Sequence, residues 1–135
     1  MEYKIDKKVA EQIIVADDTE KLVSEAEVIG KYLAKDLSTS QIRNVFGTVK
    51  QVSLSWTAQS TAEEGKAYYR QILLLKPKMA YQEGRAGRQQ KEAIRSFRQV
   101  LEQSINCIEG DVKRFKRFAE FFEAILAYHK AYGGK

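Results

Sequence analysis

Residues 112–131 read VKRFKRFAEFFEAILAYHKA, and this stretch decides the fold class. Its apolar side chains recur at spacings of three and four residues, which places them on one face of an α-helix. The members of this face are Val112, Phe115, Phe118, Ala119, Phe122, Ile125, Leu126 and His129. Gly110-Asp111 before the stretch and Gly133-Gly134 after it suit the two ends of a helix. The pattern therefore predicts a helix with a buried face.

The same helix carries a second apolar strip on another side. Its members are Phe121, Ala124, Tyr128 and Ala131. The last helix of a small bundle rarely needs burial on two sides, so two interpretations remain open. The strip either belongs to the core or meets a neighbouring copy of the protein. In the second case Phe121 and Tyr128 are the predicted subunit contacts.

Four more helices are predicted upstream, because the same apolar period recurs there. Their expected ranges are about 19–35, 39–56, 61–84 and 88–108. Side chains that accept hydrogen bonds from free backbone amides precede the first three of them. These capping residues are Asp17-Asp18, Ser38 with Gln41, and either Ser60 with Glu63 or Thr61 with Glu64.

Pro77 and Gly47 interrupt this helical pattern. Pro77 removes one backbone hydrogen bond, so it predicts a kink near Leu73, or an end of the helix at Leu75. We favour the kink because the apolar period resumes beyond the proline, and we expect the helix to end at Gly84. Gly47 costs about 1 kcal/mol relative to alanine inside a helix, so close packing of a backbone is expected there.

Composition predicts one compact domain over residues 1–135. Apolar residues make up 44% and charged residues 30% of the chain, which is typical of a globular protein. Only 8 glycines and 1 proline are present, too few for the many turns of a sheet. We therefore predict an all-α, five-helix bundle. The weak pattern of residues 1–18 leaves two alternatives, a short helix or a loosely docked N-terminal arm.

The chemistry of the side chains argues against an enzyme. Cys107 and His129 are the only cysteine and the only histidine, and they lie 22 residues apart without a motif. One histidine and one distant cysteine cannot supply the three or four ligands of a metal site, so no metal or cofactor is expected. Both residues are interpreted as parts of the core. Gly84 and Gly87 match the glycine spacing of a KH loop, but that domain needs a sheet.

The chain also lacks the features of a membrane or secreted protein. No run of 18 apolar residues occurs, and the N-terminal MEYK has no hydrophobic core of a signal peptide. We therefore expect a cytoplasmic protein without membrane contact.

Positive charge is concentrated in the second half of the chain. Residues 65–135 contain 15 Lys and Arg against 7 Asp and Glu, whereas residues 1–64 contain 8 against 11. The helix expected at 88–108 has a basic stripe composed of Arg88, Lys91, Arg95 and Arg98. Such spacing suits a polyanion with a regular backbone. The alternative is a solvated face that is partly paired through Glu92 and Glu102.

Three stretches, taken in order, resemble one family. They are LSTSQIRNVF at 37–46, MAYQEGR at 79–85 and FEAILAYHKAYGGK at 122–135. Together they are similar to the small helical subunit of type III-A CRISPR effector (Csm) complexes. The resemblance does not cover residues 1–36. Pro77 departs from the family, which more often has an ordinary helix former there.

The resemblance implies a non-catalytic five-helix subunit that is present in several copies. The copies are expected to stack on one another and on other effector subunits. They are expected to contact the backbones of guide RNA and target RNA without reading sequence, while the subunits that hold the guide cut the target. A guide differs with every spacer, so a sequence-blind contact is required.

Five cations are the predicted RNA contacts. Arg43 and Arg85 match basic positions of the resembling blocks, whereas Lys50, Lys78 and Arg88 follow from helix geometry. Arg43 has a structural alternative, an ion pair that organises the bundle. The alternative function is a basic helical adaptor that docks an acidic protein and makes no RNA contact.

Overall fold

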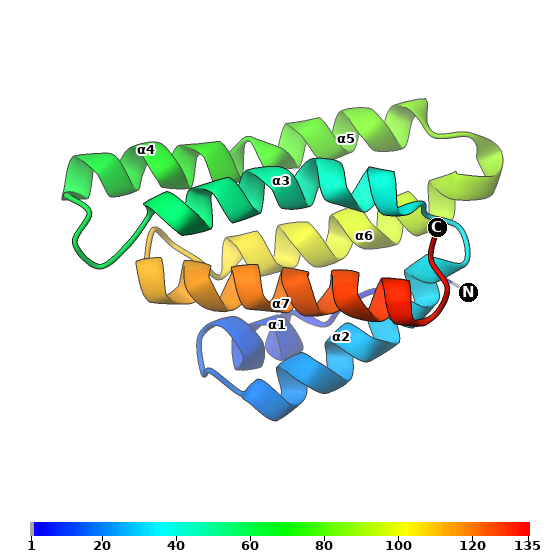
Figure 1. The fold of residues 1–135 in the computed structure, drawn as a ribbon, viewed down its shortest axis with the longest axis horizontal. Coiled ribbons are helices and arrows are strands. Elements are labelled where there is room, and N and C mark those ends of the chain that lie inside the picture. Colours follow the sequence, from blue (N-terminus) through cyan, green and yellow to red (C-terminus); the bar gives the residue numbers. More distant parts are fainter. Residues whose placement is uncertain (1) are drawn as a thin grey trace.

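The computed structural model describes residues 2–135, and their regular structure is entirely helical. The elements are α1 (Lys7–Ile14), α2 (Thr19–Ala34), α3 (Thr39–Ser55), α4 (Ala62–Leu73), α5 (Leu75–Arg85), α6 (Arg88–Asn106) and α7 (Val112–Ala131). Figure 1 shows α4 and α5 end to end as one rod beside α3. The all-α prediction is confirmed. The predicted number of five helices is wrong, because the described residues form seven helical segments, or six rods when α4 and α5 are counted together.

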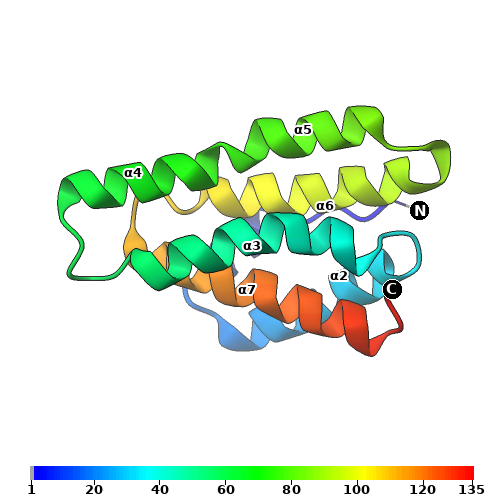
Figure 2. The ribbon, with the colours of Figure 1, turned by 45° about the horizontal axis from the view of Figure 1, so that its top comes forward.

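Helix α7, which is formed by residues 112–131, lies at the centre of the bundle. It contacts α1, α2, α3 and α6 (Figures 1 and 2). Phe122 is 2% exposed, and the rings of Phe46 from α3 and Phe97 from α6 pack on it at centroid distances of 5.8 and 5.5 Å. The predicted apolar face of this helix is therefore the face around which the core assembles.

The second apolar strip of α7 is partly covered within the chain, where α2 packs against α7. Phe121 is only 1% exposed. Gly30 brings α2 so close that a Cβ at this position would lie 2.6 Å from Cβ of Tyr128 and 2.9 Å from the carbonyl oxygen of Ile125. Phe121 is thus a core residue, which corrects its assignment as a contact to a neighbouring copy. Tyr128 is only partly buried.

Capping chemistry determines where the helices begin. Asp18 accepts from the amide of Lys21, and Ser38 and Gln41 form the predicted capping box at α3. Of the two alternatives at α4, the structure has Thr61 with Glu64. Gly84 does not end α5, because the helix continues to Arg85 and is capped at Ala86.

The break associated with Pro77 lies at Leu74, one residue beyond the predicted kink. Leu74 has φ −71° and ψ −9°, ends α4 and begins α5. Pro77 is then the third residue of α5, in the first turn, where its missing amide proton would have no helical partner in any case. Because a new helix starts at Leu75, the proline removes no hydrogen bond from the helix.

Residues 2–18 are docked on the bundle and contain the short helix α1, so the loosely docked arm is the wrong alternative for them, whereas residue 1 lies outside the described residues. Ile5 is 3% exposed. Its amide donates to Oε1 of Gln99 at 2.7 Å, and Nε2 of Gln99 donates to the Ile5 carbonyl at 2.8 Å. The hydroxyl of Tyr3 donates to Glu25, and burial together with this carboxylate raises the pKa of Tyr3. These contacts join the arm to α6 and α2.

Candidate nucleic-acid interface

All five predicted cations are exposed, and two of them meet at one end of the bundle. Arg85 is the last residue of α5 and Arg88 the first of α6. Arg85 lines a surface groove with Gln41 of α3 and Gln90 of α6. The N-cap of α6 is Gly87, which has no side chain to accept from the first amides, so these amides add positive potential beside both arginines.

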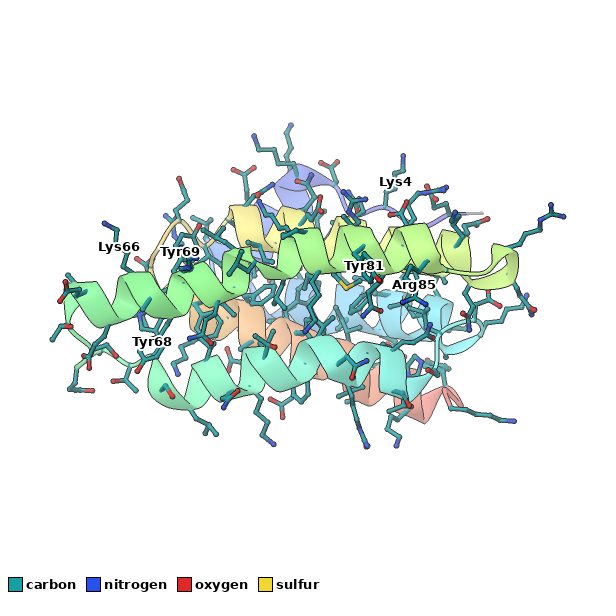
Figure 3. All side chains as sticks on the ribbon, turned by 90° about the horizontal axis from the view of Figure 1, so that it is seen from above. Lys4, Lys66, Tyr68, Tyr69, Tyr81 and Arg85 are labelled. Atoms are coloured by element: carbon teal, nitrogen blue, oxygen red, sulfur yellow. The ribbon has the colours of Figure 1, made fainter. Side chains whose placement is uncertain are left out.

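Arg85 is held in place by an aromatic ring. Its guanidinium lies 5.7 Å from the ring centroid of Tyr81, and Nη1 donates to the Tyr81 hydroxyl at 3.2 Å. Tyr81 is itself 63% exposed. Figure 3 shows the two side chains together near one end of the α4–α5 rod, with Lys66 and Tyr69 toward the other end. The ring orients the guanidinium and leaves its charge in place.

The other three predicted cations lie along neighbouring helices. Arg43 and Lys50 are on α3, and Lys78 is on α5. Seven residues separate Arg43 from Lys50 and Lys78 from Arg85, which is roughly 10 Å along each helix axis. Within residues 2–135, none of the five cations forms a salt bridge. The described part of the chain therefore gives Arg43 no ion pair for its alternative, structural role.

The basic stripe on α6 is interrupted by acidic partners. Arg95 pairs with Glu2 at 3.1 Å and with Glu83 at 3.3 Å. Arg98 pairs with Glu83 at 3.2 Å and with Glu102 at 2.8 Å. The pairing through Glu102 was expected, whereas Glu83 and Glu2 are additions that the sequence did not indicate. Arg88 and Lys91, the first half of the predicted stripe, form no salt bridge within residues 2–135.

Sequence reasoning also missed the surroundings of Arg88. A groove beside it is lined by Lys31, Lys35 and Asp36 from the end of α2 and the turn that follows. More than 50 residues separate this segment from α6. No local pattern places the two together, so only the packing of α2 against the bundle reveals these neighbours.

His129 and Cys107 both lie in the interior. His129 is fully buried, and its Nε2 donates to the carbonyl oxygen of Leu37 at 2.7 Å. Cys107 is 7% exposed, and burial raises the pKa of its thiol. Among residues 2–135, no three His, Cys, Asp or Glu side chains are grouped so that they could hold a metal ion. Their positions agree with the interpretation of both residues as parts of the core.

The fold and the surface together define a small all-helical protein with unpaired cations over α3, α5 and the start of α6. A comparison with protein families identifies which family this helical protein belongs to. The Csm2 Type III-A family matches residues 16–135, nearly the whole chain, and the chain belongs to this family. It is therefore a small subunit of a type III-A CRISPR complex.

No match was found among curated proteins or among solved structures. In the part of the chain that the structure describes, every helix is too short or too polar for a membrane span. The arm and α1 lie before the residues that the family matches.

Proposed function

We propose that the chain is a non-catalytic subunit that holds the backbones of guide RNA and target RNA without reading sequence. The observation that carries this proposal is the set of five exposed cations without salt bridges in residues 2–135. These are Arg43, Lys50, Lys78, Arg85 and Arg88. Unpaired cations can release the counterions of a nucleic acid, which is the main source of sequence-independent affinity.

The form of the surface also favours backbone contact. The cations project from helix faces and from one turn, and the groove beside Arg85 is lined mainly by glutamines and small residues. A-form RNA presents phosphates and 2′-hydroxyl groups on its outside, and both accept from such donors. The stacked Arg85 guanidinium offers fixed donors to a phosphate.

We also propose that the subunit works in several copies beside the other effector subunits. Family membership supports a place in a larger complex. Exposed leucines on α3 and at the α4–α5 junction, Leu54 at 77% and Leu74 at 52% exposure, offer apolar surface for protein contacts. Tyr128 stays in this proposal as a partly buried candidate, whereas Phe121 does not.

The test is the triple variant Arg43→Ala, Arg85→Ala, Arg88→Ala. These exposed changes should leave the free energy of unfolding within about 1 kcal/mol of the parent. The dependence of log affinity on log salt concentration should become shallower by about two to three units for duplex RNA, equally for unrelated sequences. Fluorescence anisotropy across a salt series, beside thermal melting, measures both quantities.

A matched control removes three exposed lysines from other helices, Lys8→Ala, Lys113→Ala and Lys130→Ala. It has the same net charge, so it should retain most of the affinity and of the slope. If the arginine variant binds RNA as the parent does, the proposal is overturned, and the basic surface serves instead as an adaptor for an acidic protein. Equal losses in both variants would show that net charge, and not this surface, attracts RNA.

A further inference from the structure

We propose that Glu83, together with Glu2 of the N-terminal arm, sets the boundary of the RNA-binding surface. These two carboxylates form salt bridges with Arg95 and Arg98 of α6. They thereby confine the RNA to the side of α3 and α5. The inference rests on the RNA contact proposed above. It assigns to Glu83 a role in limiting the site, because this residue pairs with two arginines that would otherwise be free to bind RNA.

The geometry makes Glu83 the centre of this network. Its Oε2 accepts from Nε of Arg95 at 3.3 Å, and its Oε1 accepts from Nη1 of Arg98 at 3.2 Å. One carboxylate of α5 thus joins two guanidinium groups that are three residues apart on α6. Glu2 and Glu102 complete the network from either side, at 3.1 Å from Arg95 and 2.8 Å from Arg98.

Burial shows why phosphates cannot easily displace these partners. The side chains of Glu83 and Glu2 are 17% and 22% exposed, whereas those of Arg95 and Arg98 are 50% and 35% exposed. The carboxylates lie against the protein, and each arginine already has two of them. A phosphate that approached Arg95 would compete with both and would be repelled by both.

The charge balance differs accordingly between the two regions. The three carboxylates of the network face the two arginines and Lys4, whose ammonium lies 4.0 Å from Glu2, so the charges cancel. Figure 3 shows Lys4 on the other side of the α5 helix from α3. The five cations of the proposed RNA surface have no such partners in residues 2–135. The five cations therefore attract RNA, whereas the neutral cluster around Glu83 does not.

Part of this boundary is supplied by a segment outside the family match. Glu2 belongs to the arm, which Gln99 holds through both backbone groups of Ile5. The match begins at residue 16. The arm thus places a carboxylate on α6 that the matched residues alone do not contain.

The test compares Glu83→Gln with the parent full-length chain. Glutamine keeps the shape and one acceptor but removes the charge, so Arg95 and Arg98 each lose one of their two carboxylates and attract phosphates more strongly. Affinity for a short RNA duplex of mixed sequence should rise roughly three- to tenfold at low salt, and the salt dependence should steepen by about one to two units. Glu2→Gln removes one of the two carboxylates of Arg95 and none of Arg98, so it should give a smaller rise. It replaces Glu83→Gln as the test if that variant does not fold.

Two controls isolate the mechanism. Glu123→Gln removes the same charge from the exposed face of α7 and should change affinity less than twofold. Adding Arg95→Ala and Arg98→Ala to Glu83→Gln should abolish the gain. An unchanged affinity and slope in Glu83→Gln overturns the boundary.

The outcome also separates this inference from the proposed function. If the parent binds RNA through Arg43, Arg85 and Arg88 but Glu83→Gln leaves the affinity and its salt dependence unchanged, the proposed function holds. The proposed boundary is then overturned. If the parent shows no salt-dependent binding, the proposed function is overturned and the boundary with it, and a gain in Glu83→Gln would then show only that Glu83 blocks Arg95 and Arg98.

Discussion

At the residue scale, Cys107 illustrates how burial sets chemical behaviour. Its thiol donates to the carbonyl oxygen of Gln103 at 3.4 Å at the end of α6. Burial is the main cause that raises its pKa, and the carboxylates of Glu11 and Glu109 act in the same direction. The thiolate is the nucleophilic form of cysteine, so the raised pKa makes Cys107 less reactive toward electrophiles in the folded chain.

We therefore predict that Cys107 reacts slowly with iodoacetamide in the native protein. The rate should be lower than that of the unfolded chain by roughly tenfold or more at the same pH, because both access and thiolate fraction are reduced. Because the native pKa is raised, the rate should keep increasing with pH beyond the point where the unfolded chain levels off. Mass spectrometry with and without denaturant measures both rates. Equal rates would contradict the buried placement.

His129 shows a different consequence of burial. Its Nε2 ties α7 to the carbonyl of Leu37, between α2 and α3, whereas its Nδ1 has no hydrogen-bond partner among the described residues. Gly134 packs directly on the imidazole, at a distance that leaves no room for a side chain. The histidine therefore acts in packing, and the glycine that follows α7 is required by that contact.

At the element scale, the contact between α2 and α7 depends on Gly30. A Cβ there would lie 2.8 Å from the amide nitrogen of His129 and 2.9 Å from the carbonyl oxygen of Ile125. Both are backbone atoms of a packed helix and cannot move aside as a flexible side chain would. The close approach therefore fixes α2 against the part of α7 that contains Ile125 and His129.

Gly30→Ala should therefore destabilise the protein despite the better helix propensity of alanine. We expect a loss of about 2 kcal/mol in the free energy of unfolding, because overpacking outweighs the gain in propensity. Gly47→Ala on α3 is the matched control, since nothing lies within 4 Å of the position a Cβ would take. This finding also corrects the expectation of close packing at Gly47.

The control should be stabilised by up to about 1 kcal/mol, the difference in helix propensity between the two residues. Chemical denaturation followed by circular dichroism compares both variants with the parent. If Gly30→Ala were as stable as Gly47→Ala, the two helices would not be in the close contact described.

At the scale of the whole molecule, the arm depends on one side chain from the distant helix α6. Gln99 satisfies both the amide and the carbonyl of Ile5 across 94 residues of sequence. Burying these backbone groups without partners would cost about 1–3 kcal/mol each. The docked state of residues 2–6 therefore relies on this amide.

Gln99→Ala should release the arm while the rest of the bundle remains folded. Hydrogen exchange at Ile5 should accelerate by at least roughly tenfold, which corresponds to the loss of about 1.4 kcal/mol of local stability. Gln89→Ala, an exposed position on the same helix, is the control and should leave the exchange unchanged. Unaltered protection of Ile5 in Gln99→Ala would mean that apolar packing alone holds the arm.

The sequence by itself determined the features that depend on neighbours along the chain. The helical class, the apolar face of α7 and the caps at Ser38 and Thr61 all follow from spacings of three or four residues, because a helix turn brings such residues together. The exposure of the five predicted cations follows in the same way, since each lies off an apolar face. Three blocks of sequence were enough to indicate the family.

Only the tertiary structure decided what lies against each face. Periodicity shows that Phe121 is on an apolar strip, but not that its side chain is buried within the chain. Helix α2, which packs against α7, lies about 90 residues earlier in the sequence. The pairing of Glu83 with Arg95 and Arg98 spans separations of 12 and 15 residues across a turn. Such contacts depend on how helices pack, which sums weak interactions over the whole molecule and leaves no local pattern. The stripe of basic residues was therefore visible in the sequence, whereas the neutralisation of half of it was not.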